Sequence, residues 1–410
     1  MLGLLIGTPW ALFGEALAIC GVFRVMARHA RPLSPVGLYV LVTLYLLFMI
    51  YLVDTVIAPF PGAYAFLLGI RKSMIPWLFV GCGVLATTAL RSRLQRCVSL
   101  MLLGACVVSL VMHHFAPGLE AQVVRHADTY TSLFAGRARL QGVFSGPFHA
   151  AMAGAYLAVL GLTSPTISKR LTLVFVAVGL GVMIDASVRT AWVSLAVGLL
   201  AFGLSGPSGL LRLVTWPRAF AASAVIAAIA VAGATMKAAP TMRVISSVAA
   251  WRTDARLLNR LPSYRTAWSM FSERPVTGWG AGTAGDTMQR FFPAGGHVTS
   301  HNLAVKFAIE AGTLGVGLIL ALLLVIVVVL WLRPSRESRS TLAVAGMFLA
   351  FGATGSAVDA APVSWAVLLA IGIGVNYATH ASSHGVQRDA SEGGPPTNRS
   401  SCGSRRRSKR

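Results

Sequence analysis

The sequence predicts an all-α, polytopic membrane protein, and three observations support this fold class. Of its 410 residues, 55% are hydrophobic and only 12% are charged, whereas a soluble globular chain carries about 25% charged residues. Long apolar runs recur throughout the chain, and about 20 apolar residues in a helix cross a bilayer core. The runs are continuous and do not alternate with polar residues, so helices are favoured over the strands of a barrel.

We expect about 11 to 12 transmembrane helices in one transmembrane domain, residues 1–380. The apolar runs assigned as spans are 2–22, 36–57, 75–90, 98–115, 144–163, 171–186, 191–204, 219–236, 303–332, 342–358 and 363–377. Basic residues follow the first run and none precedes it, which favours an uncleaved span over a signal peptide. The run 303–332 exceeds what a bilayer requires, so we expect it to tilt or to extend beyond the membrane. Residues 381–410 are expected to form a disordered, basic cytoplasmic tail.

The distribution of Lys and Arg predicts the orientation of the spans. Short basic segments alternate with less basic ones along the chain, at 24–35, 91–97, 164–170, 205–218 and 333–341. Short basic loops lie on the cytoplasmic side of a membrane. Counting spans from there places Arg189, Arg265 and His301 together on the opposite side. We therefore expect a multi-pass membrane protein whose candidate functional residues face away from the cytoplasm.

The formal charge of +22 suggests nucleic acid as one possible partner. We expect no nucleic acid, because the basic residues are spread over loops between spans, where topology accounts for them. The five cysteines have neither paired nor metal-binding spacing, which predicts no disulfide and no zinc site. The outer loops lack an Asp/Glu cluster for a divalent metal, so we expect no metal and no cofactor.

A long polar loop, about residues 237–302, is expected to lie on the side away from the cytoplasm and to contain short helices. Between 237 and 300 it carries eight basic residues and three acidic ones: Lys237, Arg243, Arg252, Arg256, Arg260, Arg265, Arg274 and Arg290 against Asp254, Glu273 and Asp286. An anionic ligand would explain this excess, because the Arg guanidinium binds phosphate with two parallel hydrogen bonds. A surface helix over anionic lipid headgroups is the alternative.

Several motifs in this region carry a family resemblance that covers roughly residues 140–320. They are Arg265 with Trp268, Pro275-x-x-Gly278-x-Gly280, His301-Asn302 followed by Glu310-x-Gly312, and upstream the segments 144–149 and 187–192. Together they resemble the O-antigen ligase and O-antigen polymerase superfamily, and most of all the lipopolysaccharide O-antigen ligases. The upstream segments depart from the family pattern: His149 stands where Asn is common, and one residue is inserted before Arg189.

The resemblance implies a glycosyltransferase that moves O-antigen polysaccharide from undecaprenyl diphosphate to a lipid A–core sugar hydroxyl. We expect the reaction to be inverting and, because the outer loops lack an acidic cluster, metal-independent. It would take place at the periplasmic face of the bacterial inner membrane. Its partners are the lipid-linked glycan, the lipid A–core acceptor and membrane lipids. Arg189 and Arg265 are expected to hold the diphosphate, and His301 is expected to take the acceptor's proton. Further residues expected to bind diphosphate or glycan are Arg137, Arg139, His149, Asn302 and Arg290.

Alternatives remain for the function. An O-antigen or exopolysaccharide polymerase, or a protein O-oligosaccharyltransferase, would share the motifs and differ in the acceptor. A flippase or exporter of lipid-linked glycan would instead carry charged residues along a path through the spans, whereas the candidates here gather at one face.

Each candidate residue also has a structural interpretation. Arg189 could snorkel to headgroups or pair with Asp185. His301 could be a cap or a buried structural histidine, although a helix N-terminus disfavours its protonated form and keeps it available as a base. His297 is a second candidate base.

Two further features of the loop and the following helix are open to both interpretations. Glu310 lies within a span, where an acidic side chain suggests function, but it could pair with Lys306 at i, i+4. The glycines 278, 280 and 282 are expected to adopt unusual backbone dihedrals.

Overall fold

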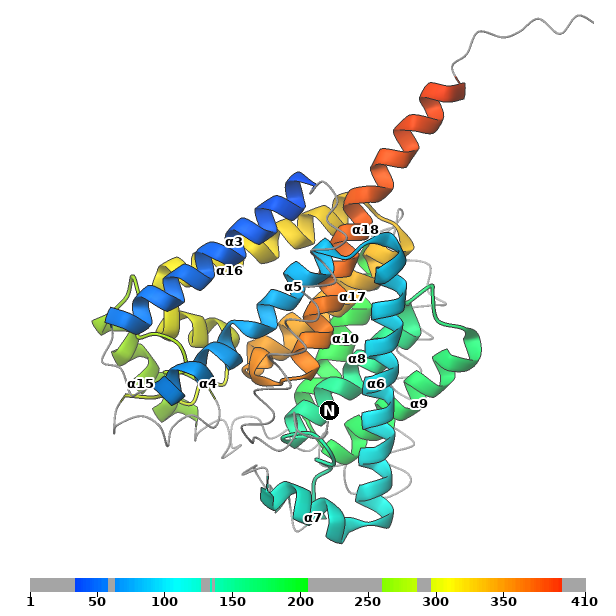
Figure 1. Ribbon diagram of the computed structural model, residues 1–410. Coiled ribbons are helices and arrows are strands. Elements are labelled where there is room, and N and C mark those ends of the chain that lie inside the picture. The colour runs from blue at the N-terminus through cyan, green and yellow to red at the C-terminus, as the bar shows by residue number, and fades with distance from the viewer. Residues whose placement is uncertain are drawn as a thin grey trace, which may run out of the picture.

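The computed structural model describes residues 34–57, 63–126, 133–134, 137–205, 260–285 and 296–392, and every structural statement below concerns these residues. This part of the chain is helical, which confirms the predicted all-α fold (Figure 1). In chain order its helices are α3 (Pro35–Ile57), α4 (Ala63–Ser73), α5 (Ile75–Leu85), α6 (Thr88–Phe115), α7 (Pro117–His126), α8 (Pro147–Thr163), α9 (Lys169–Ala186), α10 (Arg189–Leu204), α15 (Arg260–Glu273), α16 (Leu303–Leu332), α17 (Arg336–Thr354), the 3-10 helix η3 (Ala357–Asp359) and α18 (Val363–Glu392). Two short strands, β1 (Leu133–Phe134) and β2 (Arg137–Ala138), pair antiparallel.

Most predicted spans in the described residues coincide with helices. The expected boundaries of the third and fourth spans were wrong, because α5 ends at Leu85 and α6 begins at Thr88, so the expected loop 91–97 is helical. By length and composition, four segments could cross a membrane, namely Pro35–Asp54, Leu90–Phe115, Leu303–Leu332 and Val363–His380, and three shorter apolar helices are α5, α8 and α10. The polytopic character is therefore confirmed. The expected spans at 2–22 and 219–236 lie outside the described residues, so the total of 11 to 12 stays a prediction. Helix α18 continues to Glu392, and the rest of the expected tail lies outside the described residues.

Helix α8 forms the centre of the molecule and packs against α9, α10, α17 and α18. Small residues let these helices approach closely, as is common in membrane proteins. A Cβ added at Gly154 of α8 would lie 2.6 Å from the carbonyl oxygen of Gly179 on α9. A Cβ added at Gly83 of α5 would lie 2.5 Å from the backbone nitrogen of Ile373 on α18. The contact between α5 and α18 thus also requires glycine.

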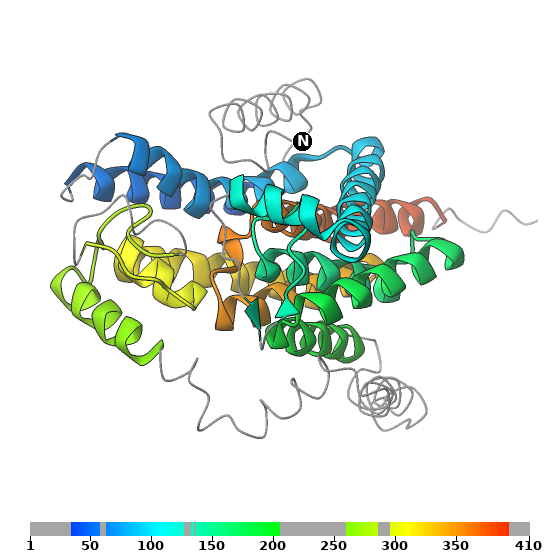
Figure 2. The same ribbon diagram turned by 90° about the horizontal axis from the view of Figure 1, so that it is seen from below.

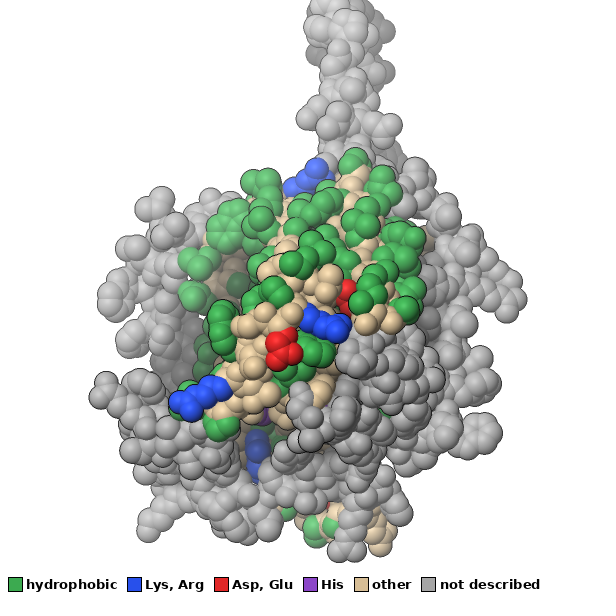
Figure 3. Space-filling model, turned by 90° about the vertical axis from the view of Figure 1, so that its left-hand side faces the viewer, with side chains coloured by type: hydrophobic (Ala, Val, Ile, Leu, Met, Phe, Trp, Pro, Cys, Tyr) green, Lys and Arg blue, Asp and Glu red, His purple; other side chains and the backbone are tan. Residues whose placement is uncertain are grey.

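Helices α3 and α16 form a second group, which lies with α15 on the opposite side of the molecule from α6, α9 and α10 (Figures 1 and 2). Their outward side chains are apolar and exposed, including Tyr45 and Val56 of α3 and Leu320 and Leu324 of α16. Seen from that side, hydrophobic side chains cover much of the described surface, and charged groups are sparse (Figure 3). This distribution fits a surface that contacts lipid.

Basic residues gather at one end of the helices. Arg333 Nη1, just after α16, donates to the carbonyl oxygens of Ala378 and Thr379 on α18 at 3.0 and 3.1 Å. Arg339 Nη2 donates to the carbonyl oxygen of Phe202, near the end of α10, at 3.2 Å. The starts of α10 and α16 therefore lie at the other end of the molecule, away from these arginines.

Candidate active site

Four helix ends meet at the end of the molecule opposite Arg333 and Arg339. Thr354, the last residue of α17, donates its hydroxyl to Thr190 Oγ1 on the first turn of α10, at 2.8 Å. Arg260 Nη1, at the start of α15, donates to the carbonyl oxygen of Thr354 at 3.4 Å. Asn302 Nδ2, at the start of α16, donates to the carbonyl oxygen of Ala353 at 3.0 Å. We call this junction the helix-end site; it comprises Arg189, Thr190, Arg260, His301, Asn302, Ala353 and Thr354.

The turn between α9 and α10 presents Arg189 to the helix-end site. Ser187 closes α9 in the left-handed conformation, with φ of 51°, and Arg189 is the first, half-buried residue of α10. Arg139 Nε donates to the carbonyl oxygen of Ala186 at 2.8 Å, and its Nη2 donates to that of Ser187 at 3.4 Å. Arg139, expected to bind substrate, thus holds the backbone of this turn. Asp185 pairs with His114, at 2.8 Å between Oδ2 and Nε2.

His301 and Asn302 stand at the start of α16 and have different surroundings. Asn302 caps the helix, because its Oδ1 accepts from the backbone nitrogens of Ala304 and Val305 at 2.7 and 3.2 Å. Together with the bond to Ala353, these contacts engage both polar atoms of the Asn302 side chain. His301 is half-buried. Burial, and next the positive charge of Arg260, lower the pKa of His301 below its ordinary value of 6.5. The imidazole is therefore neutral at pH 7 and can accept a proton.

The other predicted site residues lie in different places. Arg265 is exposed on α15, and the arginine of that helix whose charge acts on His301 is Arg260. His149 lies on the first turn of α8, where its Nδ1 contacts Ser145 Oγ. Arg137 belongs to β2, paired with Phe134. Arg290 lies outside the described residues.

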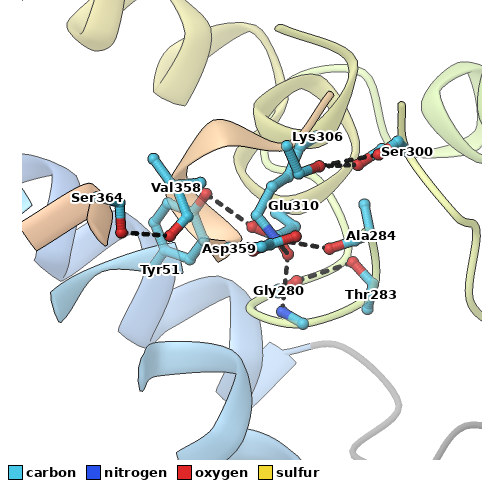
Figure 4. Close-up of polar contacts among 12 residues, drawn as sticks. Tyr51, Gly280, Thr283, Ala284, Ser300, Lys306, Glu310, Val358, Asp359 and Ser364 are labelled. Atoms are coloured by element: carbon cyan, nitrogen blue, oxygen red, sulfur yellow. Dashed lines mark hydrogen bonds and ion pairs between the residues drawn. The ribbon is translucent and has the colours of Figure 1, made fainter. Parts of the chain in front are cut away.

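A buried group of ionisable residues lies deeper in the protein, behind the start of α16 (Figure 4). We call Lys306, Glu310 and Asp359 the buried ion cluster. Lys306 Nζ lies 2.9 Å from Glu310 Oε1 and 3.2 Å from Asp359 Oδ1, and it donates to the carbonyl oxygen of Ala284 at 2.6 Å. Glu310 Oε2 accepts from the hydroxyl of Tyr51 on α3 at 3.0 Å. The predicted pairing of Glu310 with Lys306 is confirmed, and Asp359 is an addition.

His297 borders this cluster. Its side chain is 8% exposed. Burial, followed by the positive charges of Lys306 and Lys72, lowers the pKa of His297 to about 4, although Asp359 opposes the shift. His297 is therefore a neutral, buried histidine at pH 7.

Residues 274–285, which we call the glycine-rich loop, pack against a break in the helical conformation of α16 at Gly312. Gly278, Gly280 and Gly282 have φ of 82°, 89° and 86°, which confirms the expectation of unusual dihedrals, and Gly312, inside α16, has φ of 60°. The backbone nitrogens of Trp279 and Gly280 donate to the carbonyl oxygens of Ile309 and Glu310 at 2.8 and 2.9 Å. The loop thus donates to carbonyl oxygens of α16 next to the break in the helix.

Sequence reasoning identified segments of the site but did not select Arg260, Thr190 or Thr354. Arg260 was one of eight basic residues in the loop, and no motif distinguished it from the others. Thr190 and Thr354 join α10 to α17 across 164 positions of sequence, and a single sequence contains no signal for such a pair. No group of three or more His, Cys, Asp or Glu side chains that could hold a metal occurs within the described ranges.

A bundle of membrane-spanning helices that brings arginine and histidine together at one end suits a membrane enzyme acting on an anionic substrate. Residues 173–320 match the model of the O-antigen ligase family. This match confirms the resemblance to the O-antigen ligase and polymerase superfamily, and it implies a glycosyltransferase-like enzyme. The matched range contains Arg189, Arg260, Arg265 and His301 and ends before Thr354. No curated protein sequence matches the chain.

Proposed function

We propose that the protein transfers O-antigen polysaccharide from undecaprenyl diphosphate to a sugar hydroxyl of lipid A–core. The observation that carries this proposal is the helix-end site, where the start of α10, with Arg189, and the start of α16, with His301, both contact the last turn of α17. The superfamily supplies the class of substrate, a lipid-linked glycan. The acceptor and the reaction are our inference.

The orientation follows from the positions of the arginines. Arg333 and Arg339 lie at the end of the helices away from His301. If the positive-inside rule applies to these residues, their end is cytoplasmic. The helix-end site then faces the periplasm from the inner membrane, where a lipid-linked glycan would present its diphosphate at the membrane surface.

In the proposed reaction, arginine side chains bind the diphosphate. By resemblance, Arg189 and Arg265 bind it and stabilise the negative charge that grows as it leaves. Arg260, whose charge acts on His301, adds a third cation. Planar guanidinium groups form parallel, charge-assisted hydrogen bonds with phosphate oxygens. Preorganised charge of this kind can take the place of a metal ion in stabilising a leaving group.

His301 is the proposed general base. It accepts the proton of the acceptor hydroxyl while that oxygen attacks the anomeric carbon from the face opposite the diphosphate. A new glycosidic bond forms, the bond from the anomeric carbon to the diphosphate oxygen breaks, and undecaprenyl diphosphate leaves with inversion of configuration. General-base assistance is typically worth about 10²–10⁴-fold in rate.

The remaining candidates take supporting roles. Arg139 and Asn302 hold the turn before α10 and the start of α16 through their own hydrogen bonds. We therefore propose that they position Arg189 and His301. Arg137, His149 and Arg290 are proposed to contact the glycan or the diphosphate.

The test is transfer by the purified protein. The enzyme is incubated with undecaprenyl-diphosphate-linked glycan, with and without lipid A–core, and products are separated by size. We expect glycan on lipid A–core only when that acceptor is present, and no product with His301→Ala. Longer lipid-linked chains without the acceptor would identify a polymerase instead. Movement of intact lipid-linked glycan across proteoliposomes, with no new glycosidic bond, would identify a flippase and overturn the proposal.

A further inference from the structure

Helix α16 consists of two parts that differ in what holds them. Gly312, with φ of 60° and ψ of −161°, interrupts the helical conformation. Residues 303–311 before it, which we call the half-helix, start directly after His301 and Asn302. The long apolar part that follows Gly312 carries the exposed side chains Leu320 and Leu324. The break means that the position of the half-helix does not follow from that of the long part, so other contacts must determine it.

Lys306 lies in the half-helix, and its side chain contacts residues both inside and outside α16. Its side chain is 1% exposed, and its Nζ makes one contact within α16, with Glu310 Oε1. The other two lead away from the helix, to Asp359 Oδ1 of η3 at 3.2 Å and to the carbonyl oxygen of Ala284 in the glycine-rich loop at 2.6 Å. Lys306 Nζ thus donates hydrogen bonds to Glu310 Oε1 and to the carbonyl oxygen of Ala284, and its contact with Asp359 is an ion pair.

The segment on which Asp359 lies continues the last turn of α17. Ser356, three residues before Asp359, donates its hydroxyl to the carbonyl oxygen of Ser300 at 2.8 Å. Asn302 holds the carbonyl oxygen of Ala353. Three contacts, Asn302–Ala353, Ser300–Ser356 and Lys306–Asp359, therefore attach the half-helix and the chain before it to the region from α17 to η3. Among the described residues, only Lys306–Asp359 joins them by an ion pair.

The backbone at Gly285 packs directly against this ion pair. A Cβ added at Gly285 would lie 2.6 Å from Asp359 Oδ2 and 2.8 Å from Lys306 Nζ. The loop backbone thus covers the ion pair directly. An ion pair shielded from water is screened little by salt, and its geometry is restricted by the packing around it.

We propose that Lys306 is a positioning residue, which holds the half-helix, and with it His301, against η3 through its ion pair with Asp359. The role of His301 in catalysis rests on the proposed function. The ion pair itself is independent of that function.

The chain offers two matched variants, because either carboxylate can be neutralised while Lys306 keeps one partner. Asp359→Asn leaves the pair Lys306–Glu310, which lies within α16, and releases η3. Glu310→Gln leaves the pair Lys306–Asp359. Its amide oxygen can still accept from the backbone nitrogen of Gly282, and its NH2 group can donate to the hydroxyl oxygen of Tyr51. Each variant removes one negative charge from the same cluster, so a general effect on stability would be similar in both.

The first measurement is steady-state transfer. We expect Asp359→Asn to lower kcat by about 10²-fold, the order expected for a small displacement of a reacting group. The KM for the lipid-linked donor should change little, because Arg189 lies on another helix. Glu310→Gln should keep kcat near that of the unchanged protein. Equal losses in the two variants, or no loss in Asp359→Asn, would overturn the proposal.

The second measurement needs no activity. Spin labels on cysteines introduced at Ala304 and Leu324, both exposed, report the distance across the break at Gly312 in a background without the native cysteines. We expect one narrow distance in the reference protein and in Glu310→Gln, and a shifted or broadened one in Asp359→Asn. Unchanged distances in Asp359→Asn would show that the ion pair does not hold the half-helix in position. If the reference protein transferred no glycan, the proposed function would fail while the distance measurement still tested Lys306.

Discussion

The guanidinium of Arg260 lies 3.4 Å from the carbonyl oxygen of Thr354, which joins the start of α15 to the end of α17. The same arginine is the charge that lowers the pKa of His301, second to burial. Arg260 therefore connects the geometry of the helix-end site with the protonation of its proposed base.

We expect Arg260→Gln to move the acid limb of the pH–rate profile to higher pH. A neutral His301 is needed for proton abstraction, so activity is present above its pKa and is lost as pH falls through it. Loss of the positive charge removes one of the two causes that lower this pKa, so the pKa rises and activity is lost at a higher pH. The measurement is kcat/KM against pH. Arg274→Gln is the control, because the guanidinium of Arg274 lies over the ring of Trp279, 4.6 Å from its centroid, and should leave the limb in place. An unmoved limb in Arg260→Gln would contradict the assignment.

We expect His301→Ala and Arg265→Ala each to abolish ligation while the protein still inserts in the membrane. The loss for His301 should be about 10²–10⁴-fold, the usual contribution of a general base. Lipopolysaccharide ladders in cells and transfer by the purified variants provide the measurement. A near-normal ladder from either variant would show that the residue concerned has been wrongly assigned.

We expect transfer to survive an excess of EDTA. Arginine charge, in the proposed reaction, stabilises the leaving diphosphate without a metal ion. Rates are compared before and after chelation, and again after Mg²⁺ or Mn²⁺ is restored. A complete loss that the metal reverses would contradict the metal-independent mechanism.

We expect Gly312→Ala to destabilise the protein. The residue has φ of 60°, and an added Cβ would lie 2.2 Å from the carbonyl oxygen of Val276, so both backbone strain and a clash oppose the change. Strain alone is of the order of about 1–3 kcal/mol. Gly317→Ala is the matched control in the same helix, because nothing lies within 4 Å of an added Cβ there. Thermal unfolding in detergent should show a lower Tm for the first variant only. Equal Tm values would mean that the loop does not need glycine at position 312.

We expect the neutral form of His297 to make stability depend on pH. Its folded pKa of about 4 lies below the ordinary value of 6.5, so the unfolded chain binds the proton more tightly. The stability that this difference provides is fully present above pH 6.5 and is lost as pH falls toward 4. The measurement is Tm between pH 4 and 8 for the unchanged protein and for His297→Gln, in which this part of the slope should vanish. Parallel curves would refute the contribution.

Much of the fold could be predicted from single apolar runs. The runs 171–186 and 303–332 became α9 and α16 almost residue for residue, because a bilayer allows a long apolar segment few conformations other than a helix. The break in α16 could not be located from its apolar pattern, because Gly312 is one of several glycines in that run. Only the loop that packs against it, through Val276, makes its conformation necessary.

The residues of the candidate site could likewise be predicted only in part. His301, Asn302 and Arg189 were predictable, because charged or polar residues at the ends of apolar helices are conspicuous in sequence. Arg260 and Asp359 were not selected, because each takes its role from a partner far away in the chain, at Thr354 and Lys306.

The sequence by itself determined that this protein is helical, lies in a membrane and carries its polar candidates at one end of the helices. These properties depend on local composition and on the length of apolar runs, which a bilayer selects directly. Only the tertiary structure decided which arginine adjoins His301 and which carboxylate joins Glu310 in neutralising Lys306. Such pairings depend on how helices distant in sequence pack together. Neither the spacing of residues nor the composition of the chain specifies this packing.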